Sequence, residues 1–332
     1  MSETCLALGL WVLNAPDECQ MLEIDAAARL SQNFPMGGIH RAFELPRARV
    51  GLGLAKEDSH VRAIWGTVRS AGDSSYIGID GESYVPQLQL MELAWHKGWF
   101  SLHAGLIDDL WVVPQNNRWQ LRSISADLSE RLAVMERADL GGMIAVSHPD
   151  ERWNFQVQLR SGEGYRSRER NSGQNAVFRG ELKPLPKKER LSIAAFAQDG
   201  SRGFGLARAH RLGGQVYSDI SDYRFGLEAL QVWGIQGDAL REPLLISAWT
   251  QYLPEQGLQA YLRADTQREF ERSQRHIVHS GIGYRPSGDL RVWIGAEQST
   301  TPEDAGGLPG AIGSAVQREI FLQIDGQWRQ YR

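Results

Sequence analysis

The chain has 332 residues, and its 36 Lys and Arg against 40 Asp and Glu give a formal net charge of -4. This balance argues against a dedicated nucleic-acid binder, which carries an excess of basic residues. No segment reaches the ~18 consecutive apolar residues of a membrane-spanning helix, but a membrane-spanning strand needs only ~9–11 residues, half of them polar. With 35 Gly and 11 Trp, the composition favours strands and turns. It is therefore compatible with a β-barrel that spans a membrane.

Residues 1–22 precede the first expected strand, and we expect them to be an N-terminal extension, either a leader remnant or a periplasmic segment. Residues 6–13 are apolar, but no Lys or Arg precedes them, so they lack the basic start of a signal peptide. The two cysteines, Cys5 and Cys19, are equally consistent with a disulfide and with two separate thiols. The domain that follows the extension is 23–332.

From about residue 23 onward the dominant sequence period is two. Between Trp153 and Arg160, for example, Trp, Phe, Val and Leu alternate with Asn, Gln, Gln and Arg. Strict alternation of this kind indicates strands with one apolar and one polar face. About sixteen such spans occur: 23–32, 43–55, 60–70, 87–96, 99–106, 137–146, 152–161, 174–183, 190–198, 207–217, 222–235, 244–252, 257–267, 275–285, 289–298 and 316–325.

The connections between these strands alternate in length. The short ones are 56–59, 97–98, 147–151, 184–189, 218–221, 253–256 and 286–288. The long ones are 33–42, 71–86, 107–136, 162–173, 199–206, 236–243, 268–274 and 299–315. This alternation is typical of outer-membrane barrels, whereas a soluble sandwich has Greek-key connections. It predicts an all-β, transmembrane antiparallel β-barrel with short periplasmic turns and long extracellular loops.

Aromatic residues give a second indication of a barrel. Five of them lie on the apolar face of their strands, each next to a short turn: Phe100, Trp153, Tyr223, Tyr252 and Tyr284. All five therefore fall at one end of the barrel, as expected of an aromatic girdle at a membrane interface. The alternative is that they merely end the strands, as aromatics do in many soluble β proteins.

Four stretches carry a resemblance to a known family: FELPRARVGLGL (43–54), GWFSLHAGLIDDLW (98–111), RADLGGMIAV (137–146) and FQVQLRSGEGY (155–165). In this order they resemble Gram-negative outer-membrane porins, especially the phosphate-selective porin O and P type. The resemblance implies sixteen strands and a homotrimer in the lipid of the outer membrane. It also implies that the third long loop folds into the lumen. The basic run Arg166, Arg168 and Arg170 in a long loop would fit contact with the phosphates of lipopolysaccharide, although a solvated loop is the commoner explanation.

By this count the third long loop is 108–136, the longest connection. It carries five acids: Asp108, Asp109, Asp127, Glu130 and Glu136. Carboxylates in a water-filled constriction set a local field that selects ions. Taken singly, each acid is better explained as an ordinary solvated loop residue, but for the loop as a whole we favour a constriction.

Arginines gather at positions expected to face the lumen: Arg29, Arg47, Arg49, Arg160, Arg179, Arg263, Arg285 and Arg291. Arg47 and Arg49 are two residues apart on one strand and so point the same way. The resemblance implies an arginine array on the wall opposite the third loop, which would guide anions. The alternative is that these arginines simply fill a polar interior.

No catalytic or metal constellation is evident. His276 and His279 are three residues apart and so lie on opposite faces of a strand, which makes them a poor metal pair. Phosphate-binding loops, nucleophile elbows and HExxH motifs do not occur. We therefore expect neither an enzyme nor a cofactor.

These observations predict a porin, that is, a passive diffusion channel for small hydrophilic solutes or ions in the outer membrane of a Gram-negative bacterium. Two alternatives stay open. One is an outer-membrane barrel that acts as an anchor or docking component of a larger envelope assembly. The other is a soluble all-β protein that binds or hydrolyses carbohydrate.

Overall fold

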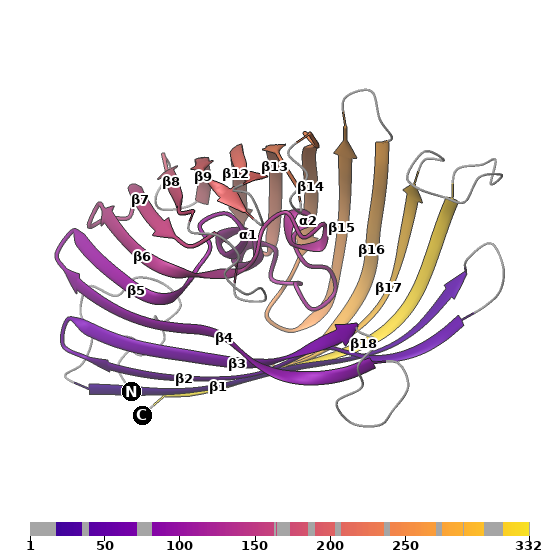
Figure 1. Cartoon of the computed structure of the whole chain (residues 1–332). Coiled ribbons are helices and arrows are strands. Elements are labelled where there is room, and N and C mark those ends of the chain that lie inside the picture. The colour runs from indigo at the N-terminus through magenta and orange to yellow at the C-terminus, as the bar shows by residue number, and fades with distance from the viewer. Residues whose placement is uncertain are drawn as a thin grey trace.

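Sixteen strands form one closed antiparallel barrel in the computed structural model (Figure 1). The structure describes residues 18–34, 40–71, 82–162, 164, 173–184, 190–202, 207–235, 240–269, 274–287, 289–301 and 315–331. The barrel strands are β1 (Glu18–Phe34), β2 (His40–Lys56), β3 (Ser59–Ala71), β4 (Glu82–Lys97), β5 (Phe100–Asp108), β6 (Ala138–Ser147), β7 (Trp153–Arg160), β8 (Asn175–Leu182), β9 (Arg190–Asp199), β12 (His210–Ile220), β13 (Tyr223–Trp233), β14 (Leu244–Tyr252), β15 (Gly257–Arg268), β16 (Gln274–Ser287), β17 (Leu290–Thr301) and β18 (Ala315–Tyr331). The predicted fold class and strand number are confirmed.

The barrel closes where its first strand meets its last. The β1–β18 pairing runs from Met21 opposite Tyr331 to Phe34 opposite Arg318. Every other barrel strand pairs with its neighbours along the sheet, so each backbone edge among these strands has a partner. Closure removes the open edges that would otherwise recruit other chains or be left unsatisfied in an apolar medium.

The strands alternate between an exposed apolar face and an inward face. On β2, for example, Val50, Leu52 and Leu54 are exposed, while Gly51 and Gly53 between them are buried. Large aliphatic side chains are exposed on other strands too: Leu258 and Ile294 are each 63% exposed. The outer surface of the barrel is therefore apolar over most of the sheet.

One strand begins later than the alternation predicts. The expected span 207–217 is β12, His210–Ile220, because residues 207–208 instead form β11. β11 (Ala207–Arg208) pairs with β10 (Ser201–Arg202) in a small two-stranded sheet separate from the barrel. β1 begins at Glu18, inside the expected extension, and residues 1–17 lie outside the described part of the chain.

Inward glycines make room for large inward aromatics on the neighbouring strand. A methyl group at Gly226 would overlap the Trp249 ring, and one at Gly283 would overlap the Trp293 ring. Both tryptophans are buried inside the barrel. Glycine is therefore required at both positions by the close approach of a ring from the neighbouring strand.

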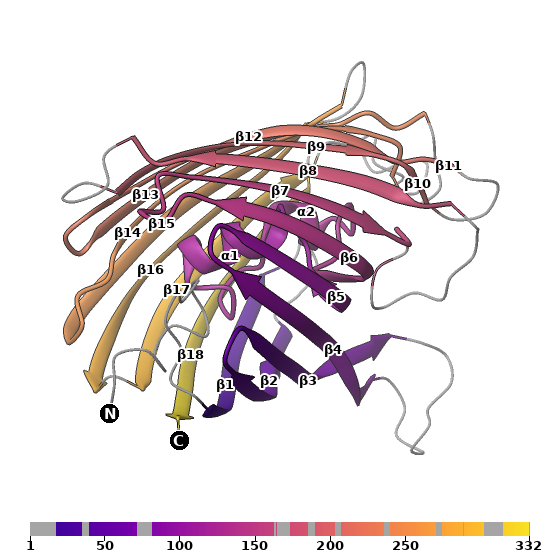
Figure 2. The same cartoon turned by 90° about the vertical axis from the view of Figure 1, so that its left-hand side faces the viewer.

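Two helices, α1 (Val112–Trp119) and α2 (Leu128–Arg131), lie in the connection between β5 and β6. Neither helix in the described residues has the length and apolar character needed to cross a membrane. In Figures 1 and 2 both helices lie within the ring of strands. The connection that holds them, 109–137, is called the third loop below.

Candidate functional site: the barrel lumen and its third loop

The third loop enters the barrel through a turn that Asp109 organises. The Asp109 carboxylate accepts hydrogen bonds from the backbone N–H groups of Trp111 and Val112, each at 2.7 Å. The same carboxylate forms a buried ion pair with Arg160 on β7. Satisfying the free N–H groups at the start of a helix stabilises it, so this acid fixes where α1 begins.

Two apolar clusters hold the loop against one side of the barrel. The first joins Trp111, Val112, Leu128 and Met135 of the loop to wall residues such as Phe196, with the Trp111 and Phe196 ring centroids 5.3 Å apart. Its strand members lie on β5, β6, β8, β9, β13, β14 and β16. Burying large apolar side chains in this way contributes ~1.5–3 kcal/mol each.

The second cluster surrounds Trp119, at the end of α1. Its ring packs edge-on against Trp249 (5.5 Å between centroids) and Tyr261 (5.7 Å). The Trp119 carbonyl also accepts a hydrogen bond from Gln251. Within the described residues, neither cluster has a member on β1–β4. The loop is therefore fixed to the β5–β18 side, and the inner face of β1–β4 carries polar and charged groups.

The tip of the loop is tied to β1 by one arginine. The Arg29 guanidinium donates to the carbonyl of Ile124 at 2.7 Å and to that of Ser123 at 3.1 Å. It also lies 4.4 Å from the Phe321 ring centroid and 3.7 Å from Glu319. This side chain thus bridges the loop and the β1–β18 seam.

The predicted pore-lining arginines fall into different environments. Arg29, Arg49, Arg160, Arg179 and Arg263 are buried in the barrel interior, whereas Arg285 and Arg291 are partly exposed. The side chain of Arg47 lies outside the described residues. Their roles in permeation stay predictions.

Most of the buried arginines are paired with a carboxylate. Arg49 lies 3.4 Å from Asp25, and Arg179 lies 2.7 Å from Glu181. Arg263 is fully buried, ion-paired with Asp265 at 2.8 Å, and its guanidinium lies 5.2 Å from the Trp119 ring. Arg263 therefore lies between the barrel wall and the third loop and contacts the loop at Trp119.

Two of the predicted constriction acids, Asp127 and Glu130, make contacts inside the loop. Asp127 is buried at the start of α2, where it accepts a hydrogen bond from the Ser129 backbone N–H at 3.2 Å, and burial raises its pKa to about 6. Glu130 is ion-paired with Arg122. Glu136 is only partly buried and borders a small cavity.

Asp108, the last residue of β5, joins the start of the third loop to the neighbouring strands β3 and β4. It lies 2.8 Å from Arg62 on β3 and 3.9 Å from Arg137. Arg62 is bound in turn to Glu92 on β4 at 3.1 Å. Sequence reasoning missed Arg62, although the predicted strand 60–70 with inward even positions would place it in the lumen.

Two further arginines join the loop to the wall and were not anticipated. Arg118 donates to Asp219 at 2.9 Å and to Glu181 at 3.3 Å. Arg131 donates to Glu297 at 2.8 Å. Because both arginines lie in a helical loop without period two, no sequence signal shows which way they point. Acidic and basic groups are thus interleaved between loop and wall rather than separated onto two faces.

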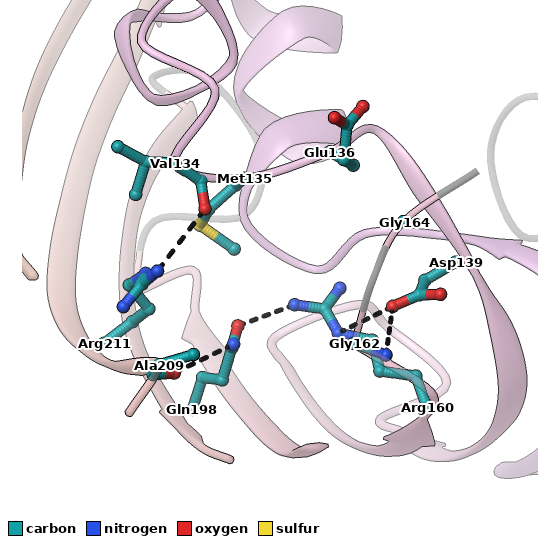
Figure 3. A pocket seen from close by; sticks show the side chains of 10 residues that line it. All are labelled: Val134, Met135, Glu136, Asp139, Arg160, Gly162, Gly164, Gln198, Ala209 and Arg211. Atoms are coloured by element: carbon teal, nitrogen blue, oxygen red, sulfur yellow. Dashed lines mark hydrogen bonds and ion pairs between the residues drawn. The ribbon is translucent and has the colours of Figure 1, made fainter. Parts of the chain in front are cut away.

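A small cavity lies where the loop returns to the wall (Figure 3). It encloses about 20 Å³, enough for about one water molecule. Arg160 donates to Gln198 at 2.6 Å, and Gln198 donates to the Ala209 carbonyl at 3.1 Å. Asp139 accepts from the Gly162 N–H at 2.7 Å. The cavity is therefore part of a hydrogen-bonded contact between loop and wall, and it is too small for a solute.

The five aromatics expected to form the girdle lie on the outward side of the sheet, beside short turns. Tyr223 and Tyr252 face each other across adjacent strands with ring centroids 4.9 Å apart, and Tyr284 is 56% exposed. Phe100 packs against Trp95, and Trp153 against Trp99. The tryptophans Trp95 and Trp99 extend the band, and the interfacial role of these rings stays a prediction.

No family model and no curated protein sequence matches the chain. Solved structures do match. An anion-selective porin from Comamonas acidovorans covers 94% of this chain and 100% of its own at 9% identity and a TM-score of 0.66. The outer-membrane channel DcaP of Acinetobacter baumannii covers 93% and 97% at 9% identity and a TM-score of 0.63. OmpT of Vibrio cholerae, in a trimer form, covers 93% and 99% at 11% identity and a TM-score of 0.56. At such identities the likeness shows the fold: this chain has the closed sixteen-stranded barrel that outer-membrane porins have.

Proposed function

We propose that the protein is a passive diffusion channel for small hydrophilic solutes or ions in the outer membrane of a Gram-negative bacterium. The observation that carries this proposal is the division of the barrel into an apolar outside and an inside with charged groups and an inserted loop. An outer surface this rich in exposed aliphatic residues is unfavourable in water and favourable in lipid. The likeness to porins of known structure supports the same conclusion.

The solute path we propose runs between the third loop and the inner face of β1–β4. The two apolar clusters hold the loop against the other strands, so the path passes beside the hydrogen bonds by which Arg29 on β1 holds the loop tip. Its charges come as neighbouring pairs of opposite sign, such as Asp25 with Arg49 and Glu92 with Arg62. Paired charges of opposite sign order water across the path. They favour the passage of small polar solutes rather than of ions of one sign.

We also propose three finer assignments. The phosphate-selective porin O and P type rests on the sequence resemblance, and the interleaved charges do not single out phosphate. A homotrimer is supported by the trimer form of the Vibrio cholerae protein of similar fold. Contact with lipid and lipopolysaccharide follows from placing the apolar outer surface in the outer membrane.

A docking barrel is the second candidate function. The observation that favours it is the dense packing of the loop inside the barrel, where Trp111, Trp119 and Trp293 are all at most 2% exposed. A plugged barrel would serve as an anchor for an envelope assembly. The soluble carbohydrate-binding or hydrolytic alternative is opposed by the apolar outer surface.

Reconstitution into a planar lipid bilayer distinguishes the two membrane functions. A diffusion channel gives stepwise ohmic conductance that rises with salt concentration, and it passes small sugars in a liposome swelling assay. Folded barrels that insert without conductance steps would overturn the channel and favour the docking barrel.

A further inference from the structure

Three histidines from three adjacent strands meet on the inner wall of the barrel. In the sheet register, His60 on β3 and His103 on β5 both lie opposite Ala94 on β4. His96 is two residues further along β4 and so points to the same side. Ala94 is small and only 1% exposed, so the three rings meet above it.

The three rings are in mutual contact. The centroids of His60 and His96 are 5.1 Å apart, those of His96 and His103 are 5.3 Å apart, and those of His60 and His103 are 6.4 Å apart. Three imidazoles around one tetrahedral zinc ion, with Zn–N distances of ~2.0–2.1 Å, have ring centroids about 5 Å apart. The spacing of the rings thus suits one shared ion.

One pair of ring nitrogens already stands at ligand spacing. The Nδ1 atom of His60 and the Nε2 atom of His96 are 3.2 Å apart. Two nitrogens bound to a tetrahedral zinc ion are separated by about 3.3 Å. A metal ion can therefore take the place of the proton that these two atoms share.

The third ring is oriented by a carboxylate. The Nδ1 atom of His103 lies 2.6 Å from Glu92, and its Nε2 atom lies 3.1 Å from the Ser101 hydroxyl. A carboxylate on one ring nitrogen, with the other nitrogen toward the metal, is the usual arrangement of histidine ligands. Among the described residues no three donor atoms already surround one point, so the His103 ring has to turn from Ser101 toward the other two.

We propose that His60, His96 and His103 bind one divalent transition-metal ion of the zinc class, with Glu92 as the residue that orients His103. A fourth position is open to water, because His60 and His96 are only half-buried on the lumen side. Ions reach the site from the short-turn end, where His60 follows the turn at residues 57–58 and His96 precedes that at 98–99. Imidazole ligands favour Zn²⁺, Ni²⁺ and Cu²⁺ over Mg²⁺.

Calorimetric titration of the full chain in detergent, without a polyhistidine tag and after chelator treatment, tests this site independently of any conductance. We expect saturable binding of one Zn²⁺ per chain and no binding of Mg²⁺. His96→Ala and His103→Ala should each weaken Zn²⁺ binding at least about tenfold, and Glu92→Gln by about 10–100-fold. The matched control is His276→Ala, an exposed histidine on β16, which should leave the affinity unchanged.

Unsaturable Zn²⁺ uptake by the unmodified protein, or wild-type affinity in His96→Ala, would overturn the site. Each variant is first shown to be folded by its mobility on an unboiled gel. A second measurement needs no variant: Co²⁺ bound in place of Zn²⁺ should give the intense visible absorption of four-coordinate cobalt. The weak absorption of six-coordinate cobalt would contradict the three-imidazole site.

Discussion

The arginines inside this barrel differ in whether their guanidinium groups contact the third loop or the wall of the proposed path. Arg263 is fully buried under Trp119 and holds Asp265, so it acts on the loop. Arg49 lies on the β1–β4 wall beside Asp25, where the proposed path runs. A charge change at Arg49 should therefore alter ion selectivity, whereas a charge change at Arg263 should alter the position of the loop.

Arg49→Glu tests this distinction. It changes one wall charge from positive to negative beside Asp25 and leaves the outward face of β2 untouched. Since a wall charge acts strongly within a Debye length of ~8–10 Å, the ratio of anion to cation permeability should fall severalfold. The effect should be largest at low salt, and reversal potentials across a salt gradient measure it.

The control for Arg49→Glu is the neighbouring outward position. Ala48→Arg places a charge toward lipid, at a cost of up to ~2–4 kcal/mol near the bilayer midplane and less near an interface. It should reduce assembly and leave the selectivity of the assembled protein unchanged. If Arg49→Glu fails to assemble while Ala48→Arg is harmless, the inward and outward faces of β2 are reversed.

At the scale of elements, the strands could be predicted from sequence and the loop's internal contacts could not. In the strands, apolar and polar residues alternate with a period of two, because one face contacts an apolar environment and the other faces the barrel interior. The small β10–β11 sheet shifted one boundary, because residues 207–208 continue the same extended pattern without joining the barrel. The hydrogen bonds that Asp109 and Asp127 accept at the starts of α1 and α2 depend on local backbone geometry, which no period reveals.

Sequence reasoning also missed contacts between side chains on different strands, because these depend on how the strands are paired. His60 and His103 come together only through the register of β3, β4 and β5 around Ala94. The predicted spans 60–70, 87–96 and 99–106 place these histidines near the same barrel end, so a register drawn from the short turns would have found them. The Arg62–Asp108 pair additionally needs the direction in which the loop leaves β5.

Removing residues 122–130 tests the third loop as the element that narrows the lumen. The deletion takes out the tip bound by Arg29 and the acids Asp127 and Glu130, and it touches no barrel strand. Single-channel conductance should rise in a planar bilayer, because the lumen beside β1–β4 widens. Trp119→Ala is the milder companion: it removes the ring at the centre of the second cluster, so it should increase current fluctuations.

An unchanged conductance after the deletion would mean that the tip of the loop does not limit the pore. The barrel itself should still form, since strand pairing does not depend on these residues. Mobility on an unboiled gel therefore has to match that of the complete chain before the conductances are compared.

The whole molecule depends on closure, because the β1–β18 seam joins the two ends of the chain into one sheet (Figure 1). With every strand edge paired, a closed barrel resists denaturation by detergent at room temperature. We expect the protein to need detergent for solubility and to migrate differently on a gel before and after boiling. Deleting β18, Ala315–Tyr331, leaves one edge of β1 and one edge of β17 unpaired and should abolish the compact unboiled species. A chain that is monodisperse in plain buffer, with the same mobility boiled and unboiled, would contradict a membrane-embedded barrel.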